Sequence, residues 1–118
     1  MAIKIDEREH FGTAVLVVMG RIALTECHGD LKDAVRGLIE RGRKQIVLDL
    51  EAVPFVDTSG LGELVSSYAS VQRLGGTLRL TNVNQRVADA LESTGLTSIL
   101  ELIELPRSSA STQPVNMR

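Results

Sequence analysis

From residue 45 onward, short apolar runs alternate with segments that have helical spacing, and this alternation restricts the fold more than any other feature of the sequence. The apolar runs have the length and composition of strands, and they cover residues 45–50, 77–83 and 99–105. Between them, apolar side chains recur every three or four residues, as on one face of a helix. These side chains are Leu61, Leu64, Val65, Tyr68 and Val71 in the first segment and Val87, Ala88 and Leu91 in the second. Strands that alternate with helices pair in parallel through right-handed crossovers, so the sequence predicts parallel βαβ units.

The start of the sequence predicts a different pairing. Residues 2–8 alternate apolar and polar side chains, and residues 13–20 form a β-branched run typical of a buried strand. The intervening His10-Phe11-Gly12 is short enough for a hairpin, which makes the two strands antiparallel. We therefore expect an α/β fold, a single domain over residues 1–105 whose mixed β-sheet combines this hairpin with the parallel units and is covered by helices. A length of 118 residues suits one domain and is too short for two.

A further helix is predicted between the hairpin and the first parallel unit. Apolar positions at helical spacing run through residues 31–39, with charged residues on the opposite side. Thr25 or Glu26 could open this helix, and Gly42 stands where a closing glycine is favoured. At the other end of the chain, residues 106–118 contain Ser, Pro and Thr without an apolar period, which predicts a disordered tail.

Composition and charge argue against several classes of function. A net charge of −2, an aromatic content of 3% and the absence of Trp argue against a nucleic-acid-binding surface. Cys27 is the single cysteine, so no internal disulfide can form, and the N-terminus lacks the apolar region of a signal peptide. The longest apolar run, Ala14–Met19, is far shorter than the roughly 20 residues of a membrane span, so we expect a cytoplasmic protein. His10 and His28 have no metal-site spacing, and we expect neither a metal nor a cofactor.

The stretch FVDTSGLGELV, residues 55–65, contains the candidate functional residues. Asp57-Thr58-Ser59 follows a predicted central strand and opens a helix, and the binding sites of parallel α/β sheets gather at such strand ends. Each of these residue types is also a favoured helix N-cap, because its side-chain oxygen accepts a hydrogen bond from a free backbone N–H. One cap is therefore explained, whereas three polar residues followed by Gly60-Leu61-Gly62 exceed what a cap requires.

A second interpretation is that one hydroxyl of this stretch is phosphorylated. A phosphoserine adds a charge of roughly −1.5 to −2, which the positive end of a helix dipole tolerates. A partner packed on the same spot would face a bulky, hydrated dianion, and Asp57 would add like-charge repulsion. Gly60 and Gly62 would leave the hydroxyl uncovered; alternatively, they serve close packing or a relaxed first turn. Spacing and composition leave cap and switch equally supported, and no acid–base pair indicates an enzyme.

The residues also carry a resemblance to a known family. DTSGLGELV is similar to the D-[ST]-S-G-[LIV]-[GQ] signature of the STAS domain family, and specifically of the bacterial anti-sigma factor antagonists. Further matches lie in the expected order: VLDLEAVPFVD leads into the signature, RLGGTLRLTNVNQRV follows the next helix, and LESTGL precedes the last strand. The resemblance covers about residues 5–103 and implies a mixed sheet covered by helices.

This resemblance implies a function and a set of site residues. In the family, the hydroxyl that matches Ser59 is phosphorylated by an anti-sigma factor that is also a serine kinase. The unmodified antagonist binds that kinase and frees the sigma factor; the phosphorylated form dissociates, and a metal-dependent serine phosphatase restores it. Ser59 is thus the implied acceptor, with Thr58 as the less favoured one and Asp57 as the orienting neighbour. We expect partner contacts from residues 57–62 and Ala23, and a protein that is a monomer or a weak dimer.

One position departs from the family pattern. The second strand of these antagonists usually ends in Gly-x-[Leu/Ile]-Asp, and the acid helps to build the partner-facing edge. Here the stretch is Gly20-Arg21-Ile22-Ala23, so Ala23 replaces the acid. The loss of a carboxylate could alter the choice of partner or slow phosphorylation. It also leaves open a second hypothesis, a stand-alone STAS subunit of a transport or signalling complex in which Ser59 is only a cap.

Overall fold

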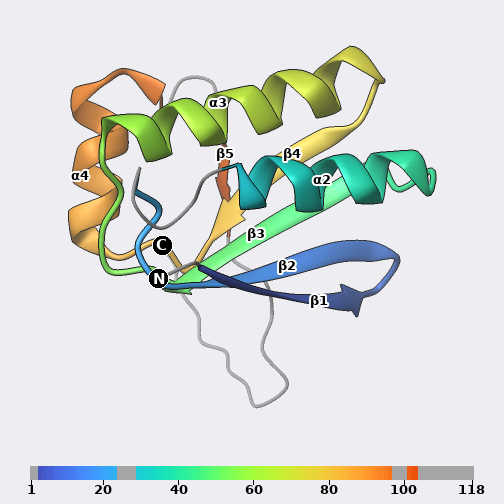
Figure 1. Ribbon diagram of the computed structural model, residues 1–118, viewed down its shortest axis with the longest axis horizontal. Helices are drawn as coiled ribbons and strands as arrows, with labels where there is room; N and C mark the ends of the chain where they lie inside the picture. The colour runs from blue at the N-terminus through green and yellow to red at the C-terminus, as the bar shows by residue number, and fades with distance from the viewer. Residues whose placement is uncertain (1–2, 24–28, 97–100, 104–118) are drawn as a thin grey trace, which may run out of the picture.

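The computed structural model describes residues 3–23, 29–96 and 101–103 and shows one mixed β-sheet with helices against it (Figure 1). Within these residues the sheet has five strands in the spatial order β1-β2-β3-β4-β5. The strands are β1 (Lys4–His10), β2 (Thr13–Met19), β3 (Gln45–Ala52), β4 (Thr77–Thr81) and β5 (Glu101–Ile103). β1 and β2 pair antiparallel, and every pairing from β2 to β5 is parallel. The predicted hairpin and the predicted parallel units are both confirmed.

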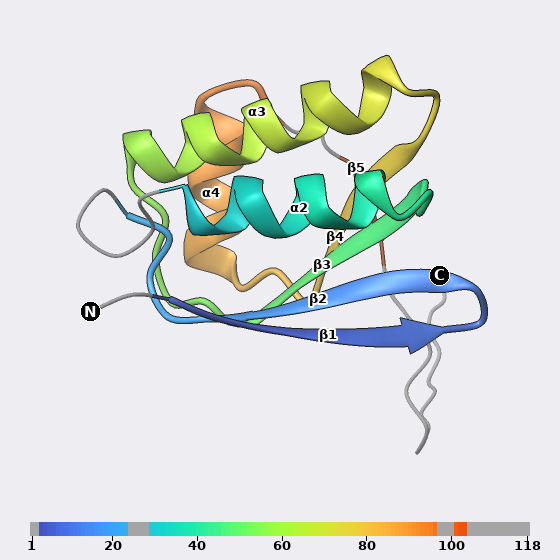
Figure 2. The ribbon, with the colours of Figure 1, turned by 45° about the vertical axis from the view of Figure 1, so that its right-hand side comes forward.

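Helices connect the parallel strands in the described part of the chain: α2 (Asp30–Glu40), α3 (Thr58–Arg73) and α4 (Gln85–Ser93). α2 and α3 lie side by side across one face of the sheet, as both ribbon views show (Figure 1 and Figure 2). Their apolar stripes turn inward, as the helical spacing predicted, although Val65 of the predicted α3 stripe is half-buried and outside the core cluster. The buried apolar side chains are Leu31, Val35 and Leu38 of α2, Leu61, Leu64 and Val71 of α3, and Val87 and Leu91 of α4.

The hydrophobic core lies between this helical layer and the sheet. Leu16, Leu48 and Leu80 are neighbours in strand register and form a row across β2, β3 and β4. Each of these three side chains is at most 2% exposed. Alternate residues of a strand point to opposite faces, so other buried aliphatic side chains of the same strands face the helices as well. They are Ala14, Val18, Ile46, Leu50 and Leu78.

The start of α2 differs from the prediction. α2 begins at Asp30, after a Gly29 N-cap with φ 84° and ψ 2°, so the prediction that Thr25 or Glu26 opens this helix is wrong. Residues 24–28 lie outside the described part of the chain. Gly29 adopts a left-handed conformation that costs glycine little, and it supplies no capping side chain. The prediction favoured polar residues because these are the usual N-caps.

The other element ends agree more closely with the prediction. Gly42, with a φ of 82°, follows the Arg41 C-cap and ends α2 as expected. The last strand, predicted over residues 99–105, is described over Glu101–Ile103. Residues 106–118 lie outside the described part, so the disordered tail and the domain boundary before it stay predictions.

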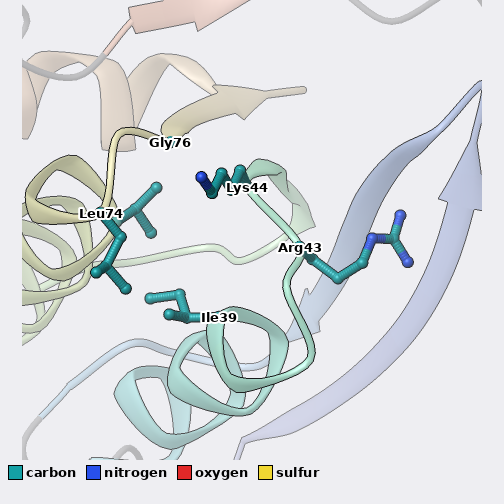
Figure 3. A pocket seen from close by; sticks show the side chains of 6 residues that line it. Ile39, Arg43, Lys44, Leu74 and Gly76 are labelled. Atoms are coloured by element: carbon teal, nitrogen blue, oxygen red, sulfur yellow. The ribbon is translucent and has the colours of Figure 1, made fainter.

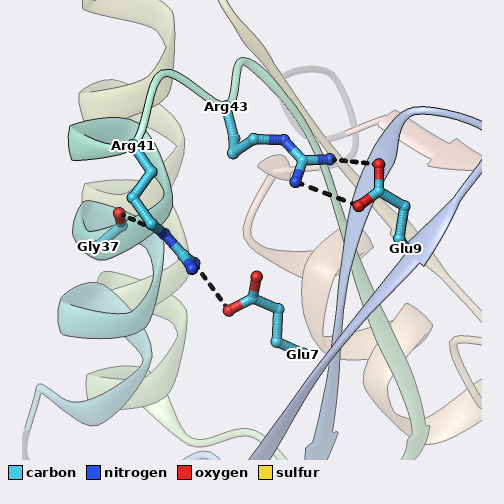
Figure 4. A network of polar contacts seen from close by, with 5 residues as sticks. All are labelled: Glu7, Glu9, Gly37, Arg41 and Arg43. Carbon is cyan, nitrogen blue, oxygen red and sulfur yellow. Dashed lines mark hydrogen bonds and ion pairs between the residues drawn. The ribbon is translucent and has the colours of Figure 1, made fainter.

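Two ion pairs connect the end of α2 to the edge strand β1 (Figure 4). Arg41 Nη2 lies 2.7 Å from Glu7 Oε1, and Arg43 Nη2 lies 3.2 Å from Glu9 Oε2. Exposed ion pairs of this kind stabilise a fold by only about 0–1 kcal/mol each. Charges along an edge strand also discourage pairing with another chain, which is a second reason for their position.

Candidate functional site

The predicted site lies at the carboxyl end of β3, where the chain enters α3. The segment after β2 runs beside this connection. The N–H of Ile22 donates to the carbonyl of Phe55 at 3.0 Å, and the N–H of Asp57 donates to the carbonyl of Ile22 at 3.2 Å. Ile22 and Val56 also form an isolated parallel bridge. The structure therefore brings residues 20–23, the stretch that departs from the family pattern, next to the start of α3.

Asp57 is the N-cap of α3. Its backbone is extended, with φ −95° and ψ −176°, and its Oδ1 accepts the N–H of Gly60 at 2.8 Å. Its carbonyl accepts the N–H of Leu61 at 2.8 Å, which is the first hydrogen bond of the helix. Of the three polar residues that could cap this helix, Asp57 does so. The hydroxyls of the next two residues are therefore not needed to start it.

Thr58 and Ser59 occupy the first two positions of α3, and both side chains are exposed. Neither hydroxyl forms a hydrogen bond with another described residue. The first turn of α3 contains no acidic residue, and the carboxylate of the Asp57 N-cap lies at the positive end of the helix dipole. An exposed hydroxyl here can accept a phosphoryl group without displacing an internal contact.

The two glycines of the signature differ in whether the packing around them requires a glycine. A Cβ at Gly60 would overlap the carbonyl of Ile22 and would lie 2.9 Å from Cγ1 of Val56. Gly60 is thus required for the close approach of α3 to the end of β2, the close-packing role that the sequence left open. A Cβ at Gly62 would meet nothing within 4 Å, and Gly62 is exposed. Close packing does not explain Gly62.

Two further residues that were predicted to contact a partner, Leu61 and Ala23, are buried beneath the surface. Leu61 is 8% exposed and is part of the hydrophobic core. Ala23 is also 8% exposed. Because both side chains are buried, they can shape the surface through the backbone that they position but offer a partner little contact area.

The start of α4 contacts the same connection. Asn84, the N-cap of α4, accepts the N–H of Val87 at 2.8 Å and donates its side-chain N–H to the carbonyl of Val53 at 2.8 Å. The Arg86 guanidinium lies 5.6 Å from the centre of the Phe55 ring, within range of a cation–π interaction. Sequence reasoning missed Asn84, whose only local signal is its suitability as a helix N-cap.

Glu63 is another residue near the site that sequence reasoning missed. Its Oε2 accepts the backbone N–H of Lys32, in the first turn of α2, at 3.0 Å. This hydrogen bond is partly buried and joins residues 31 positions apart in the chain. No local spacing rule could have indicated the contact, because it depends on α2 and α3 lying side by side.

A small cavity lies at the end of the molecule away from Ser59, between the last turns of α2 and α3 (Figure 3). Its volume is about 30 Å³, and its walls include Ile39, Lys44, Leu74 and Gly76. This volume holds about one water molecule and is far below that of a small-molecule site.

The described residues offer no metal site and no membrane segment. No group of His, Cys, Asp or Glu side chains among them is arranged to hold a metal ion. None of the helices in the described ranges combines the length and apolar character that crossing a bilayer demands.

Comparison with known proteins identifies the family. The model of the STAS domain family matches residues 4–110. The chain belongs to the STAS domain family. The match spans every described strand and helix of this STAS domain, and the DTSGLGELV signature forms the start of α3.

Relatives of this STAS domain include two anti-sigma factor antagonists. The anti-sigma-B factor antagonist of Bacillus subtilis is 26% identical over 102 residues, which cover 86% of this chain and 92% of the relative. The anti-sigma F factor antagonist of Paenibacillus polymyxa is 28% identical over 109 residues, which cover 88% of this chain and 89% of the relative.

Solved structures confirm the fold. An anti-sigma factor antagonist from Mycobacterium paratuberculosis superposes with a TM-score of 0.75 at 23% identity, covering 86% of this chain and 85% of that one. The Bacillus cell fate determinant SpoIIAA in its phosphorylated form has a TM-score of 0.62 at 18% identity, covering 88% of this chain and 91% of that one. The predicted α/β fold, a mixed sheet covered by helices, is thus confirmed as the STAS fold.

Proposed function

We propose that this STAS domain is an anti-sigma factor antagonist that is switched at Ser59. Its unmodified form binds an anti-sigma factor with serine kinase activity in the cytoplasm, and the sigma factor is released. Phosphorylation of Ser59 reverses the binding, and a serine phosphatase restores the unmodified form. The observation that carries the proposal is the exposed Ser59 hydroxyl beside a cap that Asp57 supplies. The domain itself performs no catalysis in this scheme.

The position of Ser59 suits a switch that leaves the fold intact. The first backbone N–H groups of a helix have no partner within the helix, and the dipole favours a negative charge there. A phosphoryl group on Ser59 would therefore be tolerated by the domain. A partner docked on the same surface would have to desolvate a dianion. Weakening that complex a thousandfold requires about 4 kcal/mol, at 1.4 kcal/mol per tenfold change.

The predicted contact residues divide by exposure. Thr58, Ser59 and Gly62 are exposed, and Asp57 is half-buried. We propose that a partner touches these residues directly. The buried residues Gly60, Leu61 and Ala23 then affect binding indirectly, because they set the distance and the angle between α3 and the segment after β2.

The comparisons support the proposal at the level of the family. Both named relatives are anti-sigma factor antagonists, and SpoIIAA is a STAS fold described in a phosphorylated form. The choice of Ser59 over Thr58 rests on the family signature, since both side chains are exposed. Ala23 in place of the usual acid removes a negative charge beside Asp57, so we expect a different preference among anti-sigma kinases.

The test is phosphorylation by the cognate anti-sigma kinase with ATP, followed by mass spectrometry. Wild type and Thr58→Ala should each gain one phosphoryl group on Ser59, and Ser59→Ala should gain none. In a binding measurement, Ser59→Asp should bind the kinase at least about a hundredfold more weakly than wild type, or about 2.7 kcal/mol. Equal affinity of Ser59→Asp and wild type would contradict the switch. Co-purification with a transport or signalling complex regardless of Ser59 would favour the second hypothesis.

A further inference from the structure

α2 begins without a cap of its own. Gly29 at the N-cap position has no side chain to accept a hydrogen bond, and its carbonyl accepts the N–H of Asp33 at 2.9 Å as the helix begins. The N–H groups of the first turn would otherwise lack an acceptor. The carboxylate of Glu63, on α3, accepts one of them, the N–H of Lys32, at 3.0 Å. Glu63 therefore supplies from a neighbouring helix the cap that Gly29 cannot provide.

Glu63 also lies one helical turn after Ser59. Residues at i and i+4 share a face of a helix, with Cβ atoms about 5–6 Å apart. Ser59 is exposed, Glu63 is half-buried, and no ion pair between described residues involves Glu63. Among the described residues, the Glu63 carboxylate is paired with the Lys32 N–H and lies at the positive end of the α2 dipole.

We infer that Glu63 transmits the state of Ser59 to the first turn of α2. The inference rests on the proposed modification of Ser59 and extends it. A phosphoryl group on Ser59 places a charge of roughly −1.5 to −2 beside the Glu63 carboxylate. Like-charge repulsion displaces the carboxylate and weakens its bond to the Lys32 N–H, so the start of α2 opens more often. A partner that contacts both helices would then lose its contacts with the start of α3 and with the start of α2.

An alternative is that α3 absorbs the new charge alone. The free N–H groups of its first turn could bind the phosphoryl oxygens and hold them away from Glu63. In that case the Lys32 N–H would keep its acceptor. Hydrogen exchange at this one amide therefore separates the two possibilities.

The experiment measures amide exchange by NMR in four full-length chains. They are wild type, a chain with phosphoserine incorporated at position 59 during translation, Glu63→Gln, and the combination. Gln keeps an acceptor oxygen but removes the charge, which makes it a matched control. We expect phosphoserine to speed exchange of the Lys32 amide about tenfold when Glu63 is present, and less than about twofold in the Glu63→Gln chain. A tenfold change corresponds to about 1.4 kcal/mol.

The Val87 amide provides an internal reference. Like the Lys32 amide, it lies in the first turn of a helix and is bonded to a side chain, that of Asn84, at 2.8 Å. Its exchange should not respond to phosphoserine. Unchanged exchange at Lys32, or equal acceleration with and without the Glu63 charge, would overturn the inference. The phosphoserine is incorporated without a kinase, so unchanged exchange at Lys32 would not contradict the phosphorylation of Ser59. Conversely, a kinase that fails to modify Ser59 would not change the exchange rates measured in these four chains.

Discussion

At the scale of single residues, Gly60 and Gly62 belong to one signature but should respond in opposite ways to replacement by alanine. Gly60→Ala would drive a methyl group into the backbone carbonyl of Ile22 and to 2.9 Å from Cγ1 of Val56, so the backbone of Ile22 would have to shift. Overpacking of this kind costs about 1–3 kcal/mol. Gly62→Ala places its methyl in open space inside a helix, where Ala is favoured over Gly by up to about 1 kcal/mol. Urea unfolding should show a loss of stability for the first variant and a gain for the second.

The Gly62→Ala variant also tests the proposed partner-binding surface. Gly62→Ala is expected to stabilise the domain but to weaken binding to the anti-sigma kinase. The added methyl group lies on the exposed face of α3, where it would hinder the close approach of a docked partner. Binding that is unchanged or tighter in Gly62→Ala would remove Gly62 from the partner surface. Comparison of affinity with the free energy of unfolding in one variant keeps the two effects separate.

At the scale of elements, the connection between β3 and α3 is held by a side chain at the start of α4. Asn84 performs two tasks: it caps α4, and it donates to the carbonyl of Val53. Asn84→Ala loses the cap, at a cost of about 1 kcal/mol, and leaves a partly buried carbonyl unpaired, at about 1–3 kcal/mol. We expect a total loss of about 2–4 kcal/mol in urea unfolding. Asn84→Asp keeps the cap acceptor, loses the donor and adds a negative charge that the helix N-terminus favours, so it should fall between Asn84→Ala and wild type. An Asn84→Asp variant no more stable than Asn84→Ala would contradict the contribution of the cap.

At the scale of the whole molecule, stability depends on the row of leucines that crosses the sheet. Leu48 is fully buried between Leu16 and Leu80, and both neighbours lie in register with it. Leu48→Ala should cost about 2–5 kcal/mol, a large part of the roughly 5–15 kcal/mol that stabilises a typical domain. Leu74→Ala is the matched control, because Leu74 is 53% exposed and should lose less than about 1 kcal/mol. Similar losses in thermal or urea unfolding would contradict this assignment of the core.

Much of the fold was predictable because its signals are local. A strand buries every second residue and a helix every third or fourth, so the type of each element can be read from the spacing of apolar side chains. The hairpin, the parallel units and the three described helices follow from such spacing. Asp57-Thr58-Ser59 was recognisable as a candidate site for the same reason, since its position after a strand and before a helix is a property of adjacent residues.

The remaining features depend on residues that are far apart in the chain and meet only when it folds. The N–H of Asp57, the residue that caps α3, donates to the carbonyl of Ile22, and Gly60 must be glycine because the same carbonyl lies against it. The start of α2 was misplaced because its acceptor, Glu63, belongs to another helix. Local spacing reports which side of an element is apolar, whereas the packing of α3 against α2 and against the segment after β2 decides which polar groups form contacts inside the domain.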